Sequence, residues 1–502
     1  METEEILEEE KVNNEALDDS AIGPVSTKRT IKNLVMVLFS NVFAILSGIL
    51  VGFIIPKMME VSGYGYYKAF SLYTSYIGLL HLGFIDGIYL KLAGTKYEAF
   101  NKEKFRFYCR FLFGLQIIMM AIVCSISLFF LSTYYFYILL FVALDVLAVN
   151  FITYYEFISQ ITLRFKLISL RNIIRNTINI LAIVSLWLYH SICDVYINPL
   201  IYIGIVVAIN YLMALWYLFS YKELSFGKAA KFSECKQEIK MYFTVGMQLL
   251  LANIIGQLMF VADQQVVNIF FPNEEYATYA FAYTMINLIT IATSAISGVL
   301  YPTLKTMSNE TIKHDYGRLN AYLLMFVAFC LIIYFPLDWF IHTFLDKYVS
   351  SLKIFIIILP GVLISSSIAV IKYNCYKTFN MVRRYFFISL IMLGVAIASD
   401  VACYFIFRNT ESISIVSLVV LFIWYMLVES YFIKNYKVHW VRNVCYMLLM
   451  IGGFYASTFI PNLILAGVSY FAYYVTLTIL FNYGILKDMY HKFKNRKSEV
   501  TA

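Results

Sequence analysis

Residues 135–159 read YFYILLFVALDVLAVNFITYYEFIS, a stretch in which Asp145 and Glu156 are the only charged side chains. A helix needs about 20 mostly apolar residues to cross the hydrocarbon core of a bilayer, so this stretch predicts a membrane-spanning helix. Stretches of the same kind recur along the whole chain. Of its 502 residues, 61% are hydrophobic and 14% are charged, whereas soluble domains average about 45–50% and about 25%. The composition excludes a soluble enzyme and indicates an all-α polytopic membrane protein.

Apolar segments follow one another with short breaks, and about fourteen of them are long enough to span a membrane. The predicted spans cover residues 31–55, 69–92, 108–131, 135–159, 170–190, 197–220, 241–271, 276–301, 319–345, 351–375, 384–407, 412–433, 442–460 and 463–486. Cytoplasmic loops retain positive charge, and with fourteen spans 34 of the 39 lysines and arginines fall on one side of the membrane. Both termini are therefore expected in the cytoplasm.

The polar stretch 221–240 separates two parts of the chain that share a short repeat. Pro56 followed by Tyr64-Gly65-Tyr66-Tyr67 has a counterpart in Pro272 followed by Tyr276-Ala277-Thr278-Tyr279. A parallel repeat of two six-helix bundles is a transporter architecture, with the substrate site between the halves. We therefore predict an acidic disordered cytoplasmic tail at 1–28, six-helix bundles at 29–220 and 241–434, a cytoplasmic linker at 221–240, two further helices at 435–486, and a basic cytoplasmic tail at 487–502.

Ionisable side chains inside membrane spans are costly, so each one is a candidate functional residue. Asp86, Asp145 and Asp263 lie in the second, fourth and seventh predicted spans, and we interpret them as candidates for ion coupling or gating. The alternative for each is a structural hydrogen bond or a paired charge. Asp400, in the eleventh span, is a further candidate of the same kind.

Basic residues are expected to gather at the cytoplasmic mouth of the protein. Arg171 and Arg175 are four residues apart and therefore share a helix face, and Lys91 and Lys372 fall on the same side of the membrane. Such a set suits an anionic headgroup, above all a diphosphate, because a guanidinium offers a planar fork of donors. The alternative is the general excess of positive charge at cytoplasmic span ends.

Motifs for enzymatic chemistry are missing from the sequence. It contains no Walker A loop, no GxSxG, no HExxH and no CxxC, and its eight cysteines and six histidines are scattered. We expect no catalytic residue, no metal site, no cofactor and no nucleic-acid partner. The predicted outer loops are also too short for a soluble catalytic domain, which argues against a membrane glycosyltransferase or glycan polymerase.

Two regions of the chain resemble bacterial polysaccharide transporters. The first joins Gly63-Tyr64-Gly65-Tyr66-Tyr67-Lys68-Ala69-Phe70 to Leu82-Gly83-Phe84-Ile85-Asp86-Gly87-Ile88, and the second joins Asp263 to a Tyr-x-x-Tyr-Ala-Phe-Ala loop and Leu300-Tyr301-Pro302. These motifs are similar to those of the O-antigen and capsule repeat-unit flippases of the multidrug/oligosaccharidyl-lipid/polysaccharide superfamily. Members often carry a basic residue after the aspartate of the seventh span, whereas this chain has Gln264, which puts an ion pair there in doubt.

The resemblance implies a MATE-like fold, with two bundles around a central cavity and alternating access. It implies a flippase that moves oligosaccharide units on undecaprenyl diphosphate from the cytoplasmic to the outer leaflet of the bacterial inner membrane, for O-antigen (lipopolysaccharide) or capsule synthesis. Lys91, Arg171, Arg175 and Lys372 would hold the diphosphate, and the aspartates would couple to Na⁺ or H⁺. Membrane lipids, a polysaccharide polymerase and glycosyltransferases are the expected partners. The alternative is a cation-coupled multidrug antiporter of the same superfamily.

Overall fold

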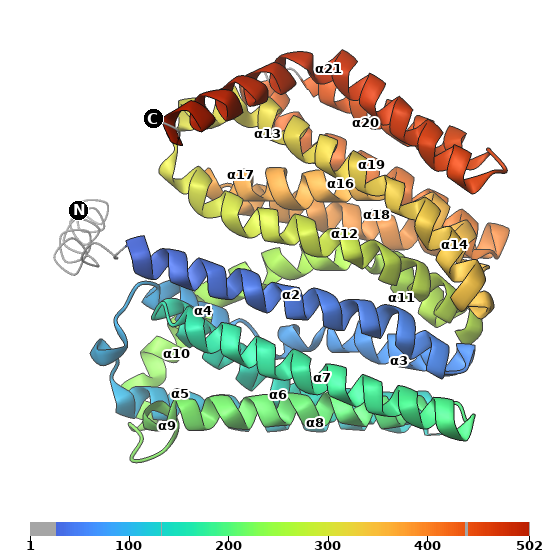
Figure 1. Ribbon diagram of the computed structural model, residues 1–502. Coiled ribbons are helices and arrows are strands. Elements are labelled where there is room, and N and C mark those ends of the chain that lie inside the picture. Colours follow the sequence, from blue (N-terminus) through green and yellow to red (C-terminus); the bar gives the residue numbers. More distant parts are fainter. Residues whose placement is uncertain (1–26, 132, 437–439, 501–502) are drawn as a thin grey trace.

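The computed structural model describes residues 27–131, 133–436 and 440–500, apart from the side chains of residues 27–42, 252, 295, 299, 302, 306, 436 and 489–500. Within these ranges the chain is almost entirely helical and contains no strand, as the composition predicted (Figure 1). The predicted acidic tail lies outside the described residues except for Thr27 and Lys28, which begin the first helix.

The helices before residue 260 form the lower part of Figure 1. They are α2 (Thr27–Met58), α3 (Val61–Thr74), the 3₁₀ turn η1 (Ile77–His81), α4 (Phe84–Leu92), η2 (Tyr97–Ala99), α5 (Lys102–Ser127), η3 (Leu128–Phe130), α6 (Tyr135–Ile161), α7 (Phe165–Cys193), α8 (Pro199–Ser220), α9 (Lys222–Ser225) and α10 (Phe232–Met259).

The later helices form the upper part of the same view. They are α11 (Ala262–Phe270), α12 (Asn273–Thr306), α13 (Asn309–Cys330), η4 (Leu331–Ile333), α14 (Tyr334–Phe344), η5 (Asp346–Tyr348), α15 (Ser351–Ile358), α16 (Gly361–Ser366), the π-turn η6 (Ser367–Lys372), α17 (Tyr373–Thr378), α18 (Val382–Phe407), α19 (Thr410–Tyr436), α20 (Trp440–Thr458) and α21 (Leu463–Val500). The last two pack on each other and on α13 as an outer layer. The predicted basic tail 487–502 is helical as far as Val500.

Ten helices in the described part of the chain are long and apolar enough to cross a membrane. The count becomes eleven if the pair Ser351–Ile358 and Gly361–Thr378, bent by 44°, is one span. The three remaining predicted spans coincide with α2, with the broken segment α3–η1–α4 and with α20. The protein is therefore a multi-pass membrane protein, and the count of fourteen stays a prediction. So does the division into two six-helix bundles.

The second predicted span is broken between α3 and α4. Gly83 has a φ of 79°, a conformation that costs glycine little because it has no Cβ. A break inside a membrane leaves carbonyl groups that need donors. The carbonyl of Ile77 accepts a bond of 3.4 Å from the Asn150 side chain, and that of Leu80 one of 3.3 Å from Gln116. Both amide side chains are fully buried, so they can donate to these two carbonyl groups where water is excluded.

The break lets α4 lie directly against α10, which comes from the later half of the predicted repeat. A Cβ added to Gly246 would lie 1.8 Å from the carbonyl oxygen of Gly83, and one added to Gly87 would lie 2.0 Å from the carbonyl oxygen of Tyr242. Glycines are required here because the two backbones touch. Tight packing between α4 and α10 therefore accounts for Gly87 and Gly246.

The two copies of the short sequence repeat also face each other. The hydroxyls of Tyr64 on α3 and Thr284 on α12 are 3.1 Å apart, and the Asn273 side chain donates to the carbonyl of Ser62 over 2.5 Å. Gly65 fits beneath Asn273, where a Cβ would come within 2.6 Å of its carbonyl oxygen. The first and second parts of the chain therefore meet at two crossings, α3 on α12 and α4 on α10.

The segment 221–240 is held against α5. Lys102 forms an ion pair of 2.7 Å with Glu223 on α9, and this partner lowers the pKa of the Glu223 carboxyl. Arg106 donates to the Glu223 carbonyl over 2.9 Å, and Arg110 donates to the Gly227 carbonyl over 2.6 Å. The predicted linker is thus a folded part of the N-terminal helices, and its second half already belongs to α10.

Candidate functional site

Two cavities among the described helices are lined by ionisable side chains. The larger, of about 530 Å³, is lined by α3, α11, α12, α16, α18 and α19. Its ionisable and amide lining consists of Lys68, Asp263, Gln264, Asn287 and Asp400. The smaller, of about 370 Å³, lies among α3, α6, α7 and α8 and is lined by Asp145, Arg171, Arg175 and Asn210 among others. The structure therefore gathers five of the candidate residues from sequence, Asp263 and Asp400 in one site and Asp145, Arg171 and Arg175 in the other.

Asp263 is buried and well supplied with donors. One carboxylate oxygen accepts hydrogen bonds from the hydroxyls of Tyr279, over 2.7 Å, and Tyr283. The other accepts from the backbone N–H of Gln264 over 2.8 Å. The two tyrosines stand one helical turn apart on α12, and so reach the same carboxylate. The Gln264 side chain also lines the cavity, and Asp263 forms no ion pair with a described residue.

Asp400 faces the same cavity from α18. The hydroxyl of Ser417 on α19 donates to one of its oxygens over 3.1 Å. The other oxygen is buried and has no hydrogen-bond partner among the described residues. An unpartnered buried carboxylate oxygen is costly, so this atom marks the place in the larger cavity where a ligand would bring the most stabilisation.

Lys68 is the one lysine or arginine among the described residues that line the larger cavity. Its ammonium lies 5.9 Å from the centre of the Tyr64 ring and has no hydrogen bond or ion pair within the part of the chain that the structure describes. Lys68 was not among the candidate residues of the sequence analysis. The break in the second span and the packing of α3 on α12 bring Lys68 into the cavity. No sequence motif predicts the break or the packing.

The smaller cavity joins residues that the sequence analysis treated separately. The side-chain amide of Asn210 on α8 donates to both oxygens of Asp145 on α6, over 3.0 and 3.1 Å. Arg171 and Arg175 reach the cavity from α7, on one helix face as their spacing predicted. A buried carboxylate and two guanidinium groups therefore border the same space.

The two arginines differ in their partners. Arg171 is buried, forms an ion pair with Glu156 on α6, and lies 5.7 Å from the centre of the Tyr217 ring. Arg175 is half-buried and makes no ion pair or hydrogen bond with any described residue. Its five N–H donors are thus available to a ligand in the smaller cavity.

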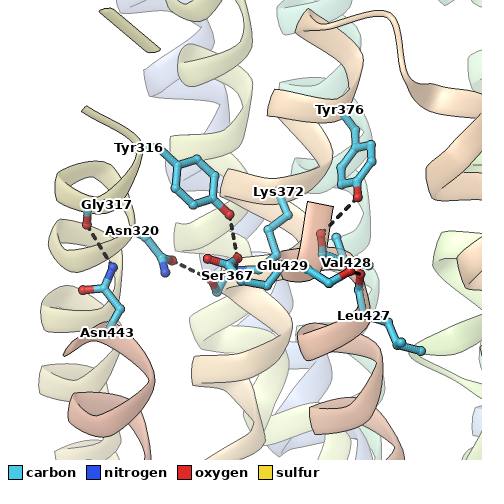
Figure 2. A network of polar contacts seen from close by, with 11 residues as sticks. Tyr316, Gly317, Asn320, Ser367, Lys372, Tyr376, Leu427, Val428, Glu429 and Asn443 are labelled. Carbon is cyan, nitrogen blue, oxygen red and sulfur yellow. Dashed lines mark hydrogen bonds and ion pairs between the residues drawn. The ribbon is translucent and has the colours of Figure 1, made fainter. Parts of the chain in front are cut away.

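Lys372 lies somewhere other than expected. Its ammonium forms an ion pair of 2.9 Å with Glu429 on α19, and both side chains are almost completely buried. Figure 2 shows this pair among Tyr316, Asn320 and Ser367, and neither of its two residues lines a cavity. Lys372 therefore has a partner inside the C-terminal helices and does not contribute to a basic mouth. Sequence analysis missed Glu429, whose only signal was an acid in the last third of an apolar run.

Lys91 and Asp86 line neither cavity. Lys91 is exposed in the last turn of α4. Asp86 is buried in the first turn of the same helix, 3.6 Å from the Nε2 atom of His81. The other ring nitrogen of His81 accepts a hydrogen bond from the Gly83 N–H over 3.2 Å, so Nε2 carries the proton and points at Asp86. His81 and Asp86 thus lie on the two sides of the break at Gly83.

Comparison with known proteins decides the family. The sequence model of the family described as "Polysaccharide biosynthesis protein" matches residues 95–352, more than half of the chain. The chain belongs to this family. The resemblance seen in the sequence motifs is thereby confirmed at the level of the family.

The fold has a counterpart among solved structures. The lipid II flippase MurJ, in an inward closed conformation, superposes with a TM-score of 0.66 at 14% sequence identity, over 91% of this chain and 100% of the other. At this identity the likeness concerns the fold. A search of curated proteins found no match. The predicted all-α polytopic membrane fold is confirmed.

Proposed function

We propose that the protein is a flippase for lipid-linked oligosaccharides. In this proposal it moves oligosaccharide units on undecaprenyl diphosphate from the cytoplasmic to the outer leaflet of the bacterial inner membrane, for an O-antigen or a capsule. Membership of a polysaccharide biosynthesis family and a fold shared with a protein named lipid II flippase support it. The excess of positive charge on one side of the predicted spans supports cytoplasmic termini.

The observation that carries the proposal is the guanidinium of Arg175 in the smaller cavity, which has no ion pair or hydrogen bond with any residue that the structure describes. A diphosphate brings negative charge and acceptor oxygens, and a guanidinium binds such a group through two parallel hydrogen bonds. Arg171 lies on the same face of α7 as Arg175 and is held in place by its ion pair with Glu156 on α6. It would present a second cation beside Arg175. Lys91, exposed at the cytoplasmic end of α4, would meet the headgroup first.

The larger cavity would then accept the glycan and the coupling ion. Hydroxyl and amide side chains from α12 and α16 line it, and they suit a sugar. Asp263 and Asp400 supply carboxylate oxygens for Na⁺ or H⁺, and Lys68 supplies a cation at the α3 wall. Asp145 would tune the charge of the smaller cavity, since it borders the same space as Arg175. A polymerase and glycosyltransferases would act before and after the transporter.

A multidrug antiporter of the same superfamily is the second candidate. It is favoured by the acidic residues of the larger cavity, because amphiphilic cations prefer an acidic site. The arginines of the smaller cavity favour the flippase.

The test compares Arg175→Gln with wild-type protein in proteoliposomes that carry a fluorescent undecaprenyl-diphosphate glycan, whose transfer is followed with a quencher that cannot cross the membrane. Loss of a charged hydrogen bond costs about 1.5–3 kcal/mol, so transfer should fall about tenfold or more. Arg383→Gln is the matched control, because Arg383 is exposed and lines neither cavity. Wild-type transfer by Arg175→Gln would remove the headgroup assignment, and export of ethidium without glycan transfer would support the antiporter.

A further inference from the structure

The tenth predicted span contains a π-turn, η6, from Ser367 to Lys372. In an α-helix, residues five apart point about 140° away from each other around the axis. In a π-turn, the i to i+5 hydrogen bonding brings such residues onto one face. The ammonium of Lys372 accordingly donates to the Ser367 hydroxyl over 2.8 Å. The wider turn is thus what places Lys372 above Ser367.

Lys372 and Glu429 sit at the centre of a network that joins three segments. The Tyr316 hydroxyl on α13 donates to Glu429 over 2.6 Å, on the oxygen that also receives Lys372. The Ser367 hydroxyl donates to the Asn320 side chain over 2.5 Å, and the Lys372 ammonium lies 3.8 Å from the centre of the Tyr425 ring. Figure 2 shows the α13, η6 and α19 side chains converging on this pair.

Stability alone does not account for such a pair. Taking two charges into a medium of low polarity costs several kcal/mol for each ion, and apolar replacements of a buried pair are often neutral or stabilising. Single-turn π-bulges are rare and occur frequently at functional sites. Here the last residue of the π-turn, Lys372, is also one partner of the buried ion pair, which indicates a role in the working of the protein.

The π-turn is coupled to the larger cavity on one side and to α12 on the other. Ser366, the residue before the turn, lines the cavity, and its buried hydroxyl has no hydrogen-bond partner among the described residues. Asn374, just after the turn, donates to the Ser297 hydroxyl on α12 over 2.8 Å. A π-turn holds one residue more than an α-turn, so its relaxation rotates the residues on its two sides by about 100° relative to each other.

We propose that Lys372 and Glu429 are positioning residues for transport. Their ion pair holds the π-turn in the state seen here. During the transport cycle the pair opens, the turn relaxes to an α-helix, and Ser366 rotates relative to the wall of the larger cavity that α12 and α19 provide. This inference rests on the proposed transport function for its cycle, but the state of the π-turn can be measured without substrate.

The test uses the neutral double variant Lys372→Met/Glu429→Gln, which removes both charges and leaves neither one unpaired. Its unfolding midpoint should equal or exceed that of the wild type. Glycan transfer should fall at least tenfold. Deuterium uptake of residues 361–378 should rise at least threefold without substrate, because a turn that interconverts between π and α transiently breaks its backbone hydrogen bonds.

Two controls separate positioning from a structural role. Lys372→Arg keeps the ion pair and should retain transfer within about threefold. Arg318→Gln/Asp488→Asn removes an exposed ion pair of 3.0 Å between α13 and α21 and should leave all three measurements unchanged. The inference is overturned if the neutral double variant transfers glycan at the wild-type rate, if its exchange at 361–378 is unchanged, or if its unfolding midpoint falls. Should the wild type transfer no glycan, only the proposed function fails, and the exchange measurement still decides the role of the pair.

Discussion

Arg175 in the smaller cavity and Lys372 in the tenth predicted span were expected to do the same work, yet the structure gives them opposite surroundings. Arg175 is half-buried and borders a cavity, with no ion pair or hydrogen bond to any described residue. Lys372 is fully buried, paired with Glu429 and bonded to Ser367. Arg171 is intermediate, because it lines the cavity but is paired with Glu156.

The difference shows that the role of a basic residue in a membrane span depends on which side chains the neighbouring helix places beside it. Where α19 offers a carboxylate, the cation becomes part of the protein's own packing. In the smaller cavity, Asp145 on α6 is already hydrogen-bonded to Asn210 on α8, so the Arg175 guanidinium stays available to a ligand. Three single substitutions to methionine test this ranking, because each removes a cation but leaves a different carboxylate environment behind.

The largest loss of stability is expected for Lys372→Met. It leaves the Glu429 carboxylate, whose side chain is 2% exposed, as an uncompensated buried charge, which costs about 3–5 kcal/mol of unfolding free energy. Denaturant unfolding of the detergent-solubilised protein measures the change. Adding Glu429→Gln to the same chain should restore the stability to at least that of the wild type, and a double variant no more stable than Lys372→Met would show that the charge is not the cause.

Arg171→Met should have an intermediate effect. Its partner Glu156 has a side chain 23% exposed, so water can compensate part of the lost ion pair, and we expect a loss of about 1–3 kcal/mol. The same unfolding measurement applies. A loss as large as that of Lys372→Met would contradict the argument from burial.

Arg175→Met should change stability least. No ion pair or hydrogen bond to a described residue is lost, and substitutions away from such features usually stay within about 0.5 kcal/mol. Binding of a fluorescent undecaprenyl-diphosphate glycan should nevertheless weaken. A stability loss equal to that of Arg171→Met, with unchanged binding, would mean that Arg175 serves the fold and not a ligand.

Much of the fold could be predicted because hydropathy reports membrane burial directly. The long apolar runs become α5, α6, α7, α8 and most later helices. The 44° bend between α15 and α16 lies at Pro360, a residue type that interrupts a helix. The break at Gly83 was not predicted, because its stability depends on Asn150 and Gln116 from other helices.

The candidate site was only partly predictable for the same reason. The four-residue spacing of Arg171 and Arg175 is a local property of one helix, and it placed them on one face. Glu429 as the partner of Lys372, and Lys68 as a lining residue of the larger cavity, depend on contacts between segments far apart in the sequence. A single sequence carries no signal for such pairings.

The sequence by itself determined that this protein is a helical, multi-pass membrane protein without an enzymatic motif, because the bilayer accepts only long apolar segments whose backbone bonds are satisfied within each helix. Only the tertiary structure decided which intramembrane charges are free and which are paired. That outcome depends on the side chains that neighbouring helices bring within a few ångströms: Glu429 lies 2.9 Å from Lys372, whereas no described residue forms an ion pair with Arg175.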